Sequence, residues 1–242
     1  MNFPLQQQKA LVTGASSGIG RATALALARA GCTVALVGRS LDALKTLAQT
    51  LEATPGQGQI FPLDLSCLAD IKPQISAIAA NFGPFDILVN GAGMAYTQAL
   101  QDTSLADWQR VLDLNLTSVF EVTKAILPGM RSQKKGTIVN IASVAAHQVF
   151  PDWGLYCVTK AALVSLSKAI ALEERAHGIR VTILSPGSVN TPLWDTATVN
   201  ADFDRSLMLT PEIVAQMVLQ AILLPQEAVI EEMTLLPSIG TF

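Results

Sequence analysis

The chain has 242 residues, of which half are hydrophobic and only 14% are charged, and its formal net charge is −3. The length suits one large α/β domain, and so many apolar residues require a large core and buried subunit contacts as well. The slightly acidic balance gives no reason to expect nucleic acid or an anionic membrane surface as a partner.

The cysteines and the N-terminal residues bear on the compartment. Cys32, Cys67 and Cys157 lie far apart and match no metal-ligand spacing and no disulfide framework, so free thiols in a reducing cytoplasm are the simplest interpretation. Residues 1–8 lack the basic and apolar regions of a secretory signal, and we find no apolar run long enough to span a membrane. We therefore expect a cytoplasmic protein with no membrane partner and no metal site.

Short apolar, β-branched runs alternate with helical patterns along the chain. Residues 9–12 form the first run, a glycine-rich turn follows at 13–20, an alanine- and leucine-rich segment at 21–30 stops at Gly31, and a second run covers 33–37. This order is typical of a βαβ unit with parallel strands. The pattern predicts further strands at 59–63, 86–89, 136–141, 178–184 and 229–235, and helices at 41–53, 66–81, 105–130, 156–176 and 211–223.

No internal repeat and no linker interrupts this pattern. Residues 1–242 are therefore predicted to form a single α/β domain, a Rossmann-type doubly wound parallel sheet of about seven strands with helices on both faces. A closed eight-stranded barrel is the rival architecture, but the chain is one βα unit short of it. Ligands of a doubly wound sheet bind beyond the carboxyl ends of its strands, where the unusual residues of this chain occur.

The turn after the first strand has the composition of a pyrophosphate site. Its three glycines have the spacing G-x3-G-x-G. They permit a tight turn, a close approach of the backbone to phosphate, and close packing of helix and strand, while the helix N-terminus attracts the anion. An ordinary glycine-containing turn is the alternative. The predicted cofactor contacts in this turn are Gly14, Ser16, Ser17, Gly18, Ile19 and Gly20.

The end of the second strand bears on the type of cofactor. An acidic residue there would bond an unmodified adenosine ribose, but the chain has Gly38, Arg39 and Ser40. A planar guanidinium suits a 2′-phosphate. We therefore predict NADP(H) rather than NAD(H), with a solvated arginine at a helix start as the alternative.

Tyr156 and Lys160 lie four residues apart, so they project from the same face of the predicted helix. An ammonium about 4 Å from a phenol favours the phenolate by roughly 4 kcal/mol at an effective dielectric of about 20. This corresponds to about three pK units before the cost of desolvation. We expect Lys160 to bring the pKa of Tyr156 into the range of general acid–base catalysis. A packed tyrosine beside a solvated lysine is the alternative.

Taken together, these segments closely resemble the short-chain dehydrogenase/reductase family over essentially the whole chain. The glycine turn, Asp64 after the third strand, and residues 90–93 each match a family motif, although Gly91 replaces the second asparagine of the Asn-Asn-Ala-Gly pattern. That departure concerns the local support of the strand rather than the chemistry. The matches to the family's catalytic tetrad are Asn115, Ser143, Tyr156 and Lys160.

The resemblance implies hydride transfer between a nicotinamide cofactor and a carbonyl or alcohol carbon. It implies that Tyr156 donates the proton, that Lys160 also holds the nicotinamide ribose, that Ser143 bonds the substrate oxygen, and that Asn115 holds a water linking Lys160 to solvent. It also implies a homo-oligomer, either a dimer or a tetramer. The implied cofactor contacts beyond the first turn are Arg39, Asp64, Leu65, Asn90, Ala92, Gly93, Tyr156, Lys160, Pro186, Gly187, Val189 and Thr191.

The small-molecule substrate should meet residues 94–96, residues 144–154 and the stretch after Gly187. Apolar side chains in these regions favour an uncharged or partly apolar carbonyl compound, and they are Val144, Val149, Phe150, Pro151, Trp153 and Trp194. Residues 188–210 show little apolar periodicity and are predicted to form a mobile lid. His147 is interpreted as a substrate contact or loop hydrogen bond rather than a base, and His177 as a helix cap.

The leading hypothesis is an NADP-dependent carbonyl reductase or alcohol dehydrogenase. One alternative is a reductase of 3-oxoacyl thioesters on an acyl carrier protein, which would dock on Arg131, Lys134 and Lys135, although those residues also suit a solvated turn. A 3-hydroxy acid dehydrogenase is a further alternative. A cofactor-sensing regulatory protein on the same fold would have no need of the tetrad, so the intact tetrad argues against it.

Overall fold

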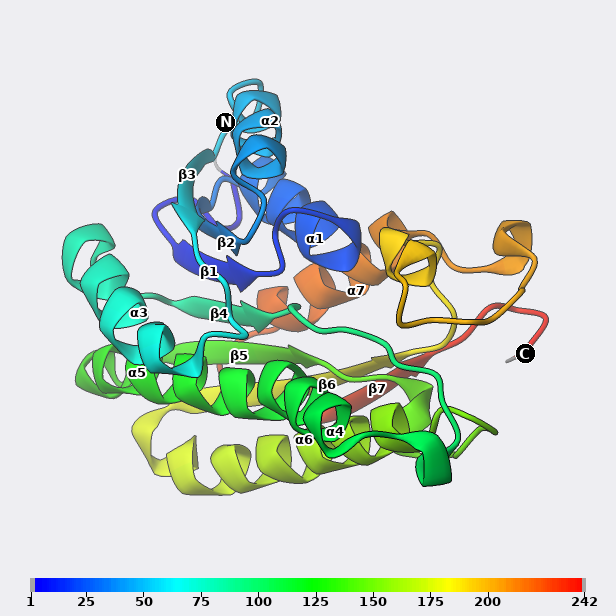
Figure 1. Cartoon of the computed structure of the whole chain (residues 1–242). Coiled ribbons are helices and arrows are strands. Elements are labelled where there is room, and N and C mark those ends of the chain that lie inside the picture. The colour runs from blue at the N-terminus through cyan, green and yellow to red at the C-terminus, as the bar shows by residue number, and fades with distance from the viewer. Residues whose placement is uncertain (1–2, 241–242) are drawn as a thin grey trace.

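Seven parallel strands form one sheet at the centre of the computed structural model, which describes residues 3–240 (Figure 1). Their order across the sheet is β3-β2-β1-β4-β5-β6-β7, so the winding direction reverses between β1 and β4. The strands are β1 (Lys9–Thr13), β2 (Thr33–Gly38), β3 (Gln57–Pro62), β4 (Ile87–Asn90), β5 (Gly136–Ile141), β6 (Ile179–Pro186) and β7 (Glu232–Leu235). The predicted doubly wound parallel sheet is confirmed.

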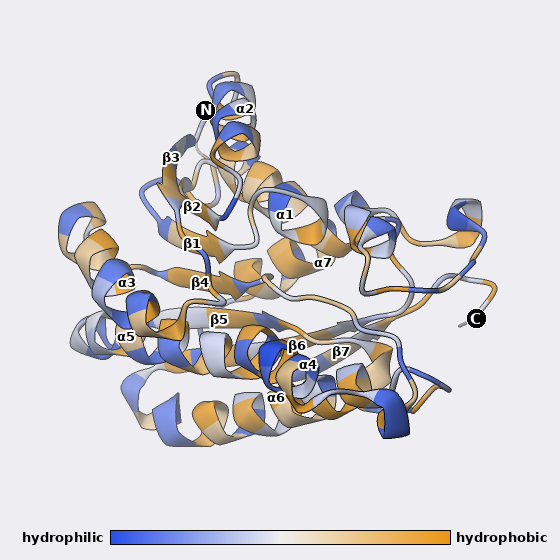
Figure 2. Cartoon of the chain, in the orientation of Figure 1, coloured by the Kyte–Doolittle hydropathy of each residue, from blue (hydrophilic) through white to orange (hydrophobic). Residues whose placement is uncertain are grey.

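Helices cover both faces of the sheet (Figure 1). One face carries α1 (Gly18–Arg29), α2 (Leu41–Leu51) and α7 (Pro211–Leu223), and the other carries α3 (Leu68–Phe82), α4 (Leu105–Leu112), α5 (Ser118–Gln133) and α6 (Gly154–Glu174). Successive strand residues point to opposite faces. Val34 and Leu36 of β2 therefore join the core under α1, α2 and α7, whereas Ala35 and Val37 join the core under α3 and α5. Figure 2 shows the resulting apolar strands between helices with polar outer sides.

The predicted helix over residues 105–130 is three elements rather than one. A π-helical turn, Asp113–Thr117, separates α4 from α5, and α5 continues through Pro128 to Gln133. A π-turn widens the helix by one residue and often marks a functional site. Asn115 is at its centre and is buried. The other predicted elements occur in the predicted order, with ends that shift by a few residues.

The longest helix, α6, bears on the prediction that no segment spans a membrane. Residues Gly154–His177, which comprise α6 and the turn after it, are long and apolar enough to cross a membrane by length and composition. The search of the sequence for uninterrupted apolar runs missed this segment, because polar side chains are scattered through it. Leu163 and Ile170 of α6 are buried against the rest of the domain, so we interpret α6 as a core helix.

The predicted basic cluster is used in contacts within the domain. The Arg131 guanidinium donates two hydrogen bonds to the buried Glu174 carboxylate, one of them from Nε at 2.7 Å. Hydrogen bonding from Arg131 holds the pKa of Glu174 below its ordinary value. Lys135 pairs with Asp86 at 3.4 Å, and Lys134 adopts the left-handed conformation that ends α5. Arg131, Lys134 and Lys135 are nevertheless exposed, so the docking of an acyl carrier on them stays an untested alternative.

Candidate active site

A cavity of about 630 Å³ lies at the carboxyl ends of the strands, and several residues between 188 and 203 line it. It brings together residues that are far apart in the sequence, since six strand ends contribute to it. The predicted residues that line it are Gly14, Ser16, Ser17, Gly18, Ile19, Gly20, Arg39, Asp64, Leu65, Ala92, Gly93, Ser143, Tyr156, Lys160, Pro186, Gly187, Val189 and Thr191.

The glycine turn has no room for side chains. A Cβ on Gly20 would lie 2.3 Å from the Gly14 carbonyl oxygen, and a Cβ on Gly14 would lie 2.8 Å from the Gly91 oxygen. Gly14 and Gly18 also have positive φ angles, of 69° and 50°, which side chains disfavour. The turn thus exposes the start of α1 to the cavity, and in the described part of the chain the Ser17 side chain does not cap it. This cradle fits a pyrophosphate.

Arg39 and Asp64 lie side by side where β2 and β3 end. Burial opposes ionisation of Asp64, but hydrogen bonds from the Ser66 amide and hydroxyl, together with the Arg39 charge, hold its pKa below the ordinary value. These two bonds measure 2.9 and 2.8 Å. Asp64 is therefore an acceptor, while the exposed Arg39 guanidinium faces the same end of the cavity.

Ser143, Tyr156 and Lys160 meet at the other end. Ser143 directly follows the buried end of β5, and its hydroxyl accepts a hydrogen bond from the Ala145 amide at 3.1 Å. Tyr156 and Lys160 occupy the first two turns of α6, as predicted. The Lys160 ammonium donates to the Ile141 carbonyl at 3.0 Å and lies 5.6 Å from the centre of the Tyr156 ring.

The ionisation of this pair differs from the sequence expectation. Burial raises the pKa of Tyr156 to about 12, although a hydrogen bond with Ser143 opposes the rise. Burial also lowers the pKa of Lys160 to about 8. The expectation that the phenol pKa falls into the neutral range was therefore wrong, because burial disfavours the phenolate more than Lys160 and Ser143 stabilise it. Tyr156 keeps its proton throughout the neutral range, which suits a proton donor.

Asn115 does not line the cavity, in contrast to the other members of the tetrad. Its Oδ1 accepts from the Met94 amide at 2.8 Å, and its Nδ2 donates to the Met94 carbonyl at 2.8 Å and to Thr159 Oγ1 at 3.1 Å. A Cβ on Gly93 would lie 3.2 Å from Asn115 Oδ1 and 3.8 Å from Lys160 Nζ. Asn115 thus links three elements near Lys160: the π-turn, the loop after β4 and helix α6. This is the geometry of a residue that positions Lys160 rather than one that contacts the substrate.

Asn90 is the second predicted residue that does not line the cavity. Its side chain points into the domain, where Nδ2 donates to Asn140 Oδ1 at 2.8 Å and to Thr123 Oγ1 at 3.3 Å. The glycine at position 91 is explained by its surroundings, since a Cβ there would lie 3.0 Å from the Thr13 carbonyl. Thr13 Oγ1 instead accepts from the Gly91 amide at 3.1 Å and supports the strand end.

Sequence reasoning gave no individual role to several residues that line the cavity, among them Leu63, Leu114, Ile141, Ser188 and Phe203, although the last two fall in the stretch predicted to meet the substrate. The buried Ser188 hydroxyl has no hydrogen-bond partner among residues 3–240, and it directly follows the predicted contact Gly187. A buried polar atom without a partner is costly, so this hydroxyl fits a ligand group with hydrogen-bonding capacity. Phe203 is the only phenylalanine in the predicted lid, and its size and apolarity were the available signal.

The two histidines take part in contacts outside the cavity. His147 Nε2 lies 2.8 Å from a carboxylate oxygen of Glu232 on β7 and 3.4 Å from Ser185 Oγ, which is a loop contact of the kind expected. His177 is in the turn that follows α6, and its charge helps to lower the pKa of Glu174. Gly178, in the left-handed conformation, ends that turn.

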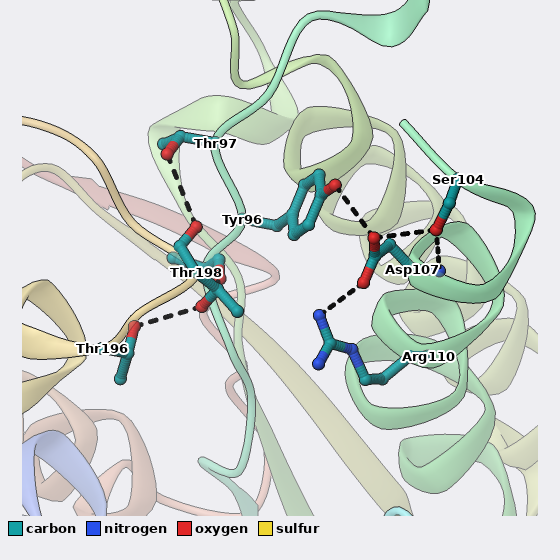
Figure 3. Close-up of polar contacts among 8 residues, drawn as sticks. Tyr96, Thr97, Ser104, Asp107, Arg110, Thr196 and Thr198 are labelled. Atoms are coloured by element: carbon teal, nitrogen blue, oxygen red, sulfur yellow. Dashed lines mark hydrogen bonds and ion pairs between the residues drawn. The ribbon is translucent and has the colours of Figure 1, made fainter. Parts of the chain in front are cut away.

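The predicted lid is bonded to the loop after β4 (Figure 3). The Thr97 amide donates to the Thr198 carbonyl at 2.9 Å, the Thr198 hydroxyl donates to the Ala95 carbonyl at 2.8 Å, and the Asn200 amide donates to Thr97 Oγ1 at 2.7 Å. Beside this clamp, Tyr96 Oη donates to Asp107 of α4 at 3.3 Å. Mobility of residues 188–210 stays a prediction, but their present position is set by specific hydrogen bonds.

Comparison with known proteins agrees with this geometry. The family model for short chain dehydrogenases matches residues 8–201, well over half of the chain. An uncharacterised oxidoreductase of Staphylococcus epidermidis is 33% identical over 233 residues, which cover 96% of this chain and 98% of that protein. Glycine betaine reductase ATRR of Emericella nidulans is 34% identical over 97% of this chain, which spans only 19% of that longer protein.

A solved structure shows the same fold throughout. The crystal structure of a metagenomic short-chain oxidoreductase in complex with NADP has a TM-score of 0.85 and 29% sequence identity, covering 97% of this chain and 99% of that one. The matched family model and the similar sequences extend through the glycine turn, Ser143, Tyr156 and Lys160. The chain therefore belongs to the short-chain dehydrogenase family.

Proposed function

We propose that the protein is an NADP(H)-dependent oxidoreductase that interconverts a carbonyl compound and its alcohol. The observation that carries this proposal is the single cavity, with Ser143, Tyr156 and Lys160 at one end and the glycine turn with Arg39 at the other. When bound, the nicotinamide cofactor supplies a hydride to the carbonyl carbon or accepts one from the alcohol carbon. The side chains of the protein must supply the proton, stabilise the charge that develops on the oxygen, and hold the cofactor.

Tyr156 donates the proton in carbonyl reduction and accepts it in alcohol oxidation. With a pKa of about 12, the phenol holds its proton until a carbonyl oxygen gains negative charge beside it. Ser143, which is hydrogen-bonded to the phenol, can donate to the same oxygen and stabilise the charge that develops there. Lys160, with a pKa of about 8, is mostly protonated at pH 7 and stabilises the phenolate once the proton has left. Asn115 positions this arrangement through Met94 and Thr159.

Three groups of residues would hold the cofactor. The glycine turn and the start of α1 suit its phosphates, Asp64 and Leu65 suit its adenine, and residues 186–191, with the unpaired Ser188 hydroxyl, suit its carboxamide. Lys160 would in addition hold the nicotinamide ribose. The NADP bound to the metagenomic neighbour supports NADP(H) over NAD(H). So does Arg39, which stands where an acidic residue would select the free ribose.

Cofactor choice should depend on Arg39 and Gly38. A hydrogen bond to a charged group contributes roughly 1.5–3 kcal/mol, or about ten- to a hundred-fold in preference. Arg39→Ala should raise the KM for NADPH by that factor and leave NADH nearly unchanged. Adding Gly38→Asp should reverse the preference, because a carboxylate repels phosphate and accepts from a ribose hydroxyl. The new Cβ would lie 3.1 Å from Ser16 Oγ and 3.3 Å from Ser16 Cβ, so Ser16 must shift slightly to admit it.

The measurement is the ratio of kcat/KM for the two cofactors in the wild type and in both variants. Arg29→Ala is the matched control, since Arg29 is exposed in the last turn of α1 and does not line the cavity. A wild type that prefers NADH would contradict the assignment. So would an Arg39→Ala variant that weakens both cofactors equally, because Arg39 would then be only a solvated residue.

We also propose that the protein forms a dimer or a tetramer through α5 and α6. Phe120 of α5 is 41% exposed, and Val158 and Leu172 of α6 are 42% and 70% exposed, so the outer sides of these helices present apolar side chains to solvent. Paired helices around a two-fold axis would bury them. Leu172→Lys should weaken the assembly, whereas Leu207→Lys on the lid should not. A single monomer peak by light scattering at micromolar concentration would contradict the proposal.

A cytoplasmic location accompanies this function. The three cysteines are free, with Cys32 and Cys157 buried, and burial raises the pKa of the Cys32 thiol to about 12, so it is unreactive. Free thiols without a disulfide framework are usual in a reducing compartment. Activity in the soluble fraction of a cell lysate, with none in the membrane pellet, is the expected result.

A further inference from the structure

A row of aromatic rings extends from the catalytic phenol to the lid. The ring centres of Tyr156 and Trp153 lie 5.5 Å apart, those of Trp153 and Trp194 5.7 Å, and those of Trp194 and Phe203 5.4 Å. Each pair meets edge to face, with interplanar angles of 72°, 62° and 83°, which is a favourable arrangement. All four residues line the cavity. We call Trp153, Trp194 and Phe203 the aromatic wall.

Among residues 3–240, no charged side chain lines the cavity beside the aromatic wall. Among the described residues that line the cavity, the ionisable ones are Arg39 and Asp64 at the distant end and the catalytic pair Tyr156 and Lys160. The segments that carry the aromatic wall also line the cavity with the apolar residues Val144, Phe150, Pro151, Pro192 and Leu193, and with the uncharged polar residues Ser188, Thr191 and Thr196. A carboxylate or phosphate on the substrate would lose its hydration there and find no opposite charge beyond the catalytic lysine.

The aromatic wall is held in place by contacts of the protein itself. The Trp194 indole N–H donates to the Val189 carbonyl at 2.7 Å. Because this N–H is already bonded, a ligand in the cavity meets the apolar surface of the indole ring. Arg205 holds the segment on either side of Trp194, because its guanidinium donates hydrogen bonds to the Thr191 carbonyl at 2.9 Å and to the Asp195 carboxylate at 3.0 Å. The clamp between Thr97 and Thr198 adds a third attachment (Figure 3). A wall formed in advance reduces the ordering cost of binding.

From these observations we propose that the substrate is an uncharged ketone that carries an aromatic ring next to its carbonyl group, and that the aromatic wall binds this ring. The inference rests on the proposed function, since it names the substrate class of the same site. In the reaction, the carbonyl carbon gains a hydride from NADPH, which becomes NADP⁺, and the carbonyl oxygen takes the Tyr156 proton. The C=O double bond becomes a CH–OH group, and solvent returns a proton to the phenolate.

A matched series of three ketones tests the substrate class. Acetophenone carries the ring, cyclohexyl methyl ketone has the same carbon skeleton without aromaticity, and benzoylformate has a carboxylate in place of the methyl group of acetophenone. Binding to the enzyme–NADP⁺ complex is measured by titration calorimetry, which requires no turnover, and reduction is measured by loss of NADPH absorbance. Acetophenone should bind about three- to ten-fold more tightly than the cyclohexyl ketone, and benzoylformate should bind most weakly.

Variants of Trp194 test whether the aromatic ring of the substrate binds at the aromatic wall. Trp194→Leu should weaken acetophenone binding about ten-fold and cyclohexyl methyl ketone binding about two-fold. Trp194→Phe should keep most of the wild-type preference for acetophenone over the cyclohexyl ketone. Trp108→Phe is the control, because Trp108 packs with Tyr96, Val111 and Leu155 and does not line the cavity. NADPH affinity, measured by fluorescence in every variant, reports whether the cofactor site is intact.

The outcomes separate this proposal from the proposed function. Equal binding of acetophenone and the cyclohexyl ketone, tighter binding of benzoylformate, or an equal loss of both neutral ketones in Trp194→Leu would overturn the aromatic substrate class. If aliphatic or charged ketones are nevertheless reduced, the proposed oxidoreductase function stands. If ring-selective binding is found but no ketone consumes NADPH, the binding proposal stands and the proposed reaction is wrong.

Discussion

Tyr156→Phe should lower kcat for carbonyl reduction by ~10²–10⁴-fold, the range typical of general acid–base catalysis. The substitution removes the proton donor but keeps the ring, so the contact with Trp153 at 5.5 Å and the packing of α6 are retained. NADPH affinity should stay near that of the wild type. Steady-state rates and NADPH fluorescence titration on the same preparation measure both effects.

The chain has only two tyrosines, so Tyr96→Phe is a matched control. Tyr96 is also buried, but its hydroxyl donates to Asp107 and it does not line the cavity (Figure 3). Removal of that hydroxyl should leave turnover within about two-fold of the wild type, since a part-buried hydrogen bond contributes modestly. Near-normal turnover in Tyr156→Phe would rule out the phenol as the proton donor.

Lys160→Met should abolish most activity and also weaken NADPH binding by about ten-fold or more, the expected loss of one hydrogen bond from a charged group. Methionine retains much of the volume of the buried lysine stem, so the effects report the ammonium rather than a cavity. Lys168→Met, two turns further along α6, removes an exposed lysine that pairs with Glu232, and should change neither quantity. Unchanged NADPH affinity in Lys160→Met would remove the ribose role.

The same lysine gives the wild type a pH dependence. Burial lowers the pKa of Lys160 to about 8, so the ammonium is present below that pH and is lost as the pH rises through it. The phenolate that forms at Tyr156 then lacks its stabilising charge. The kcat for reduction should therefore be constant near neutrality and fall above pH 8, and Lys160→Met should lack this step.

The sequence was sufficient for those parts of the site that local geometry determines. Backbone contacts as close as 2.3 Å require glycine at positions 14 and 20, and a positive φ favours it at position 18, so the spacing alone indicated the cradle. Tyr156 and Lys160 share a helix, so their juxtaposition follows from the helical repeat. The alternation of apolar runs and helical patterns likewise determined the order of the elements and the parallel sheet.

Contacts between distant segments could not be read from the sequence. Thr97 and Thr198 are 101 residues apart, and neither residue type signals a clamp. Asn115 matched a family motif, but its hydrogen bonds to Met94 depend on a π-turn that no residue pattern in 105–130 revealed. The high pKa of Tyr156 could not be predicted from its spacing to Lys160, because it results from the burial of the phenol in the folded domain.

The transfer of a labelled hydride tests the proposed reaction most directly. NADPH labelled with deuterium at the 4-position, in separate preparations for its two faces, is incubated with enzyme and a mixture of aromatic, aliphatic and 3-oxoacyl ketones, and the alcohols are analysed by mass spectrometry. We expect one deuterium on the carbinol carbon of an alcohol product with one of the two preparations, and none with Tyr156→Phe over the same time. Absence of labelled alcohol from both preparations with the wild type, despite tight NADPH binding, would contradict hydride transfer in this cavity.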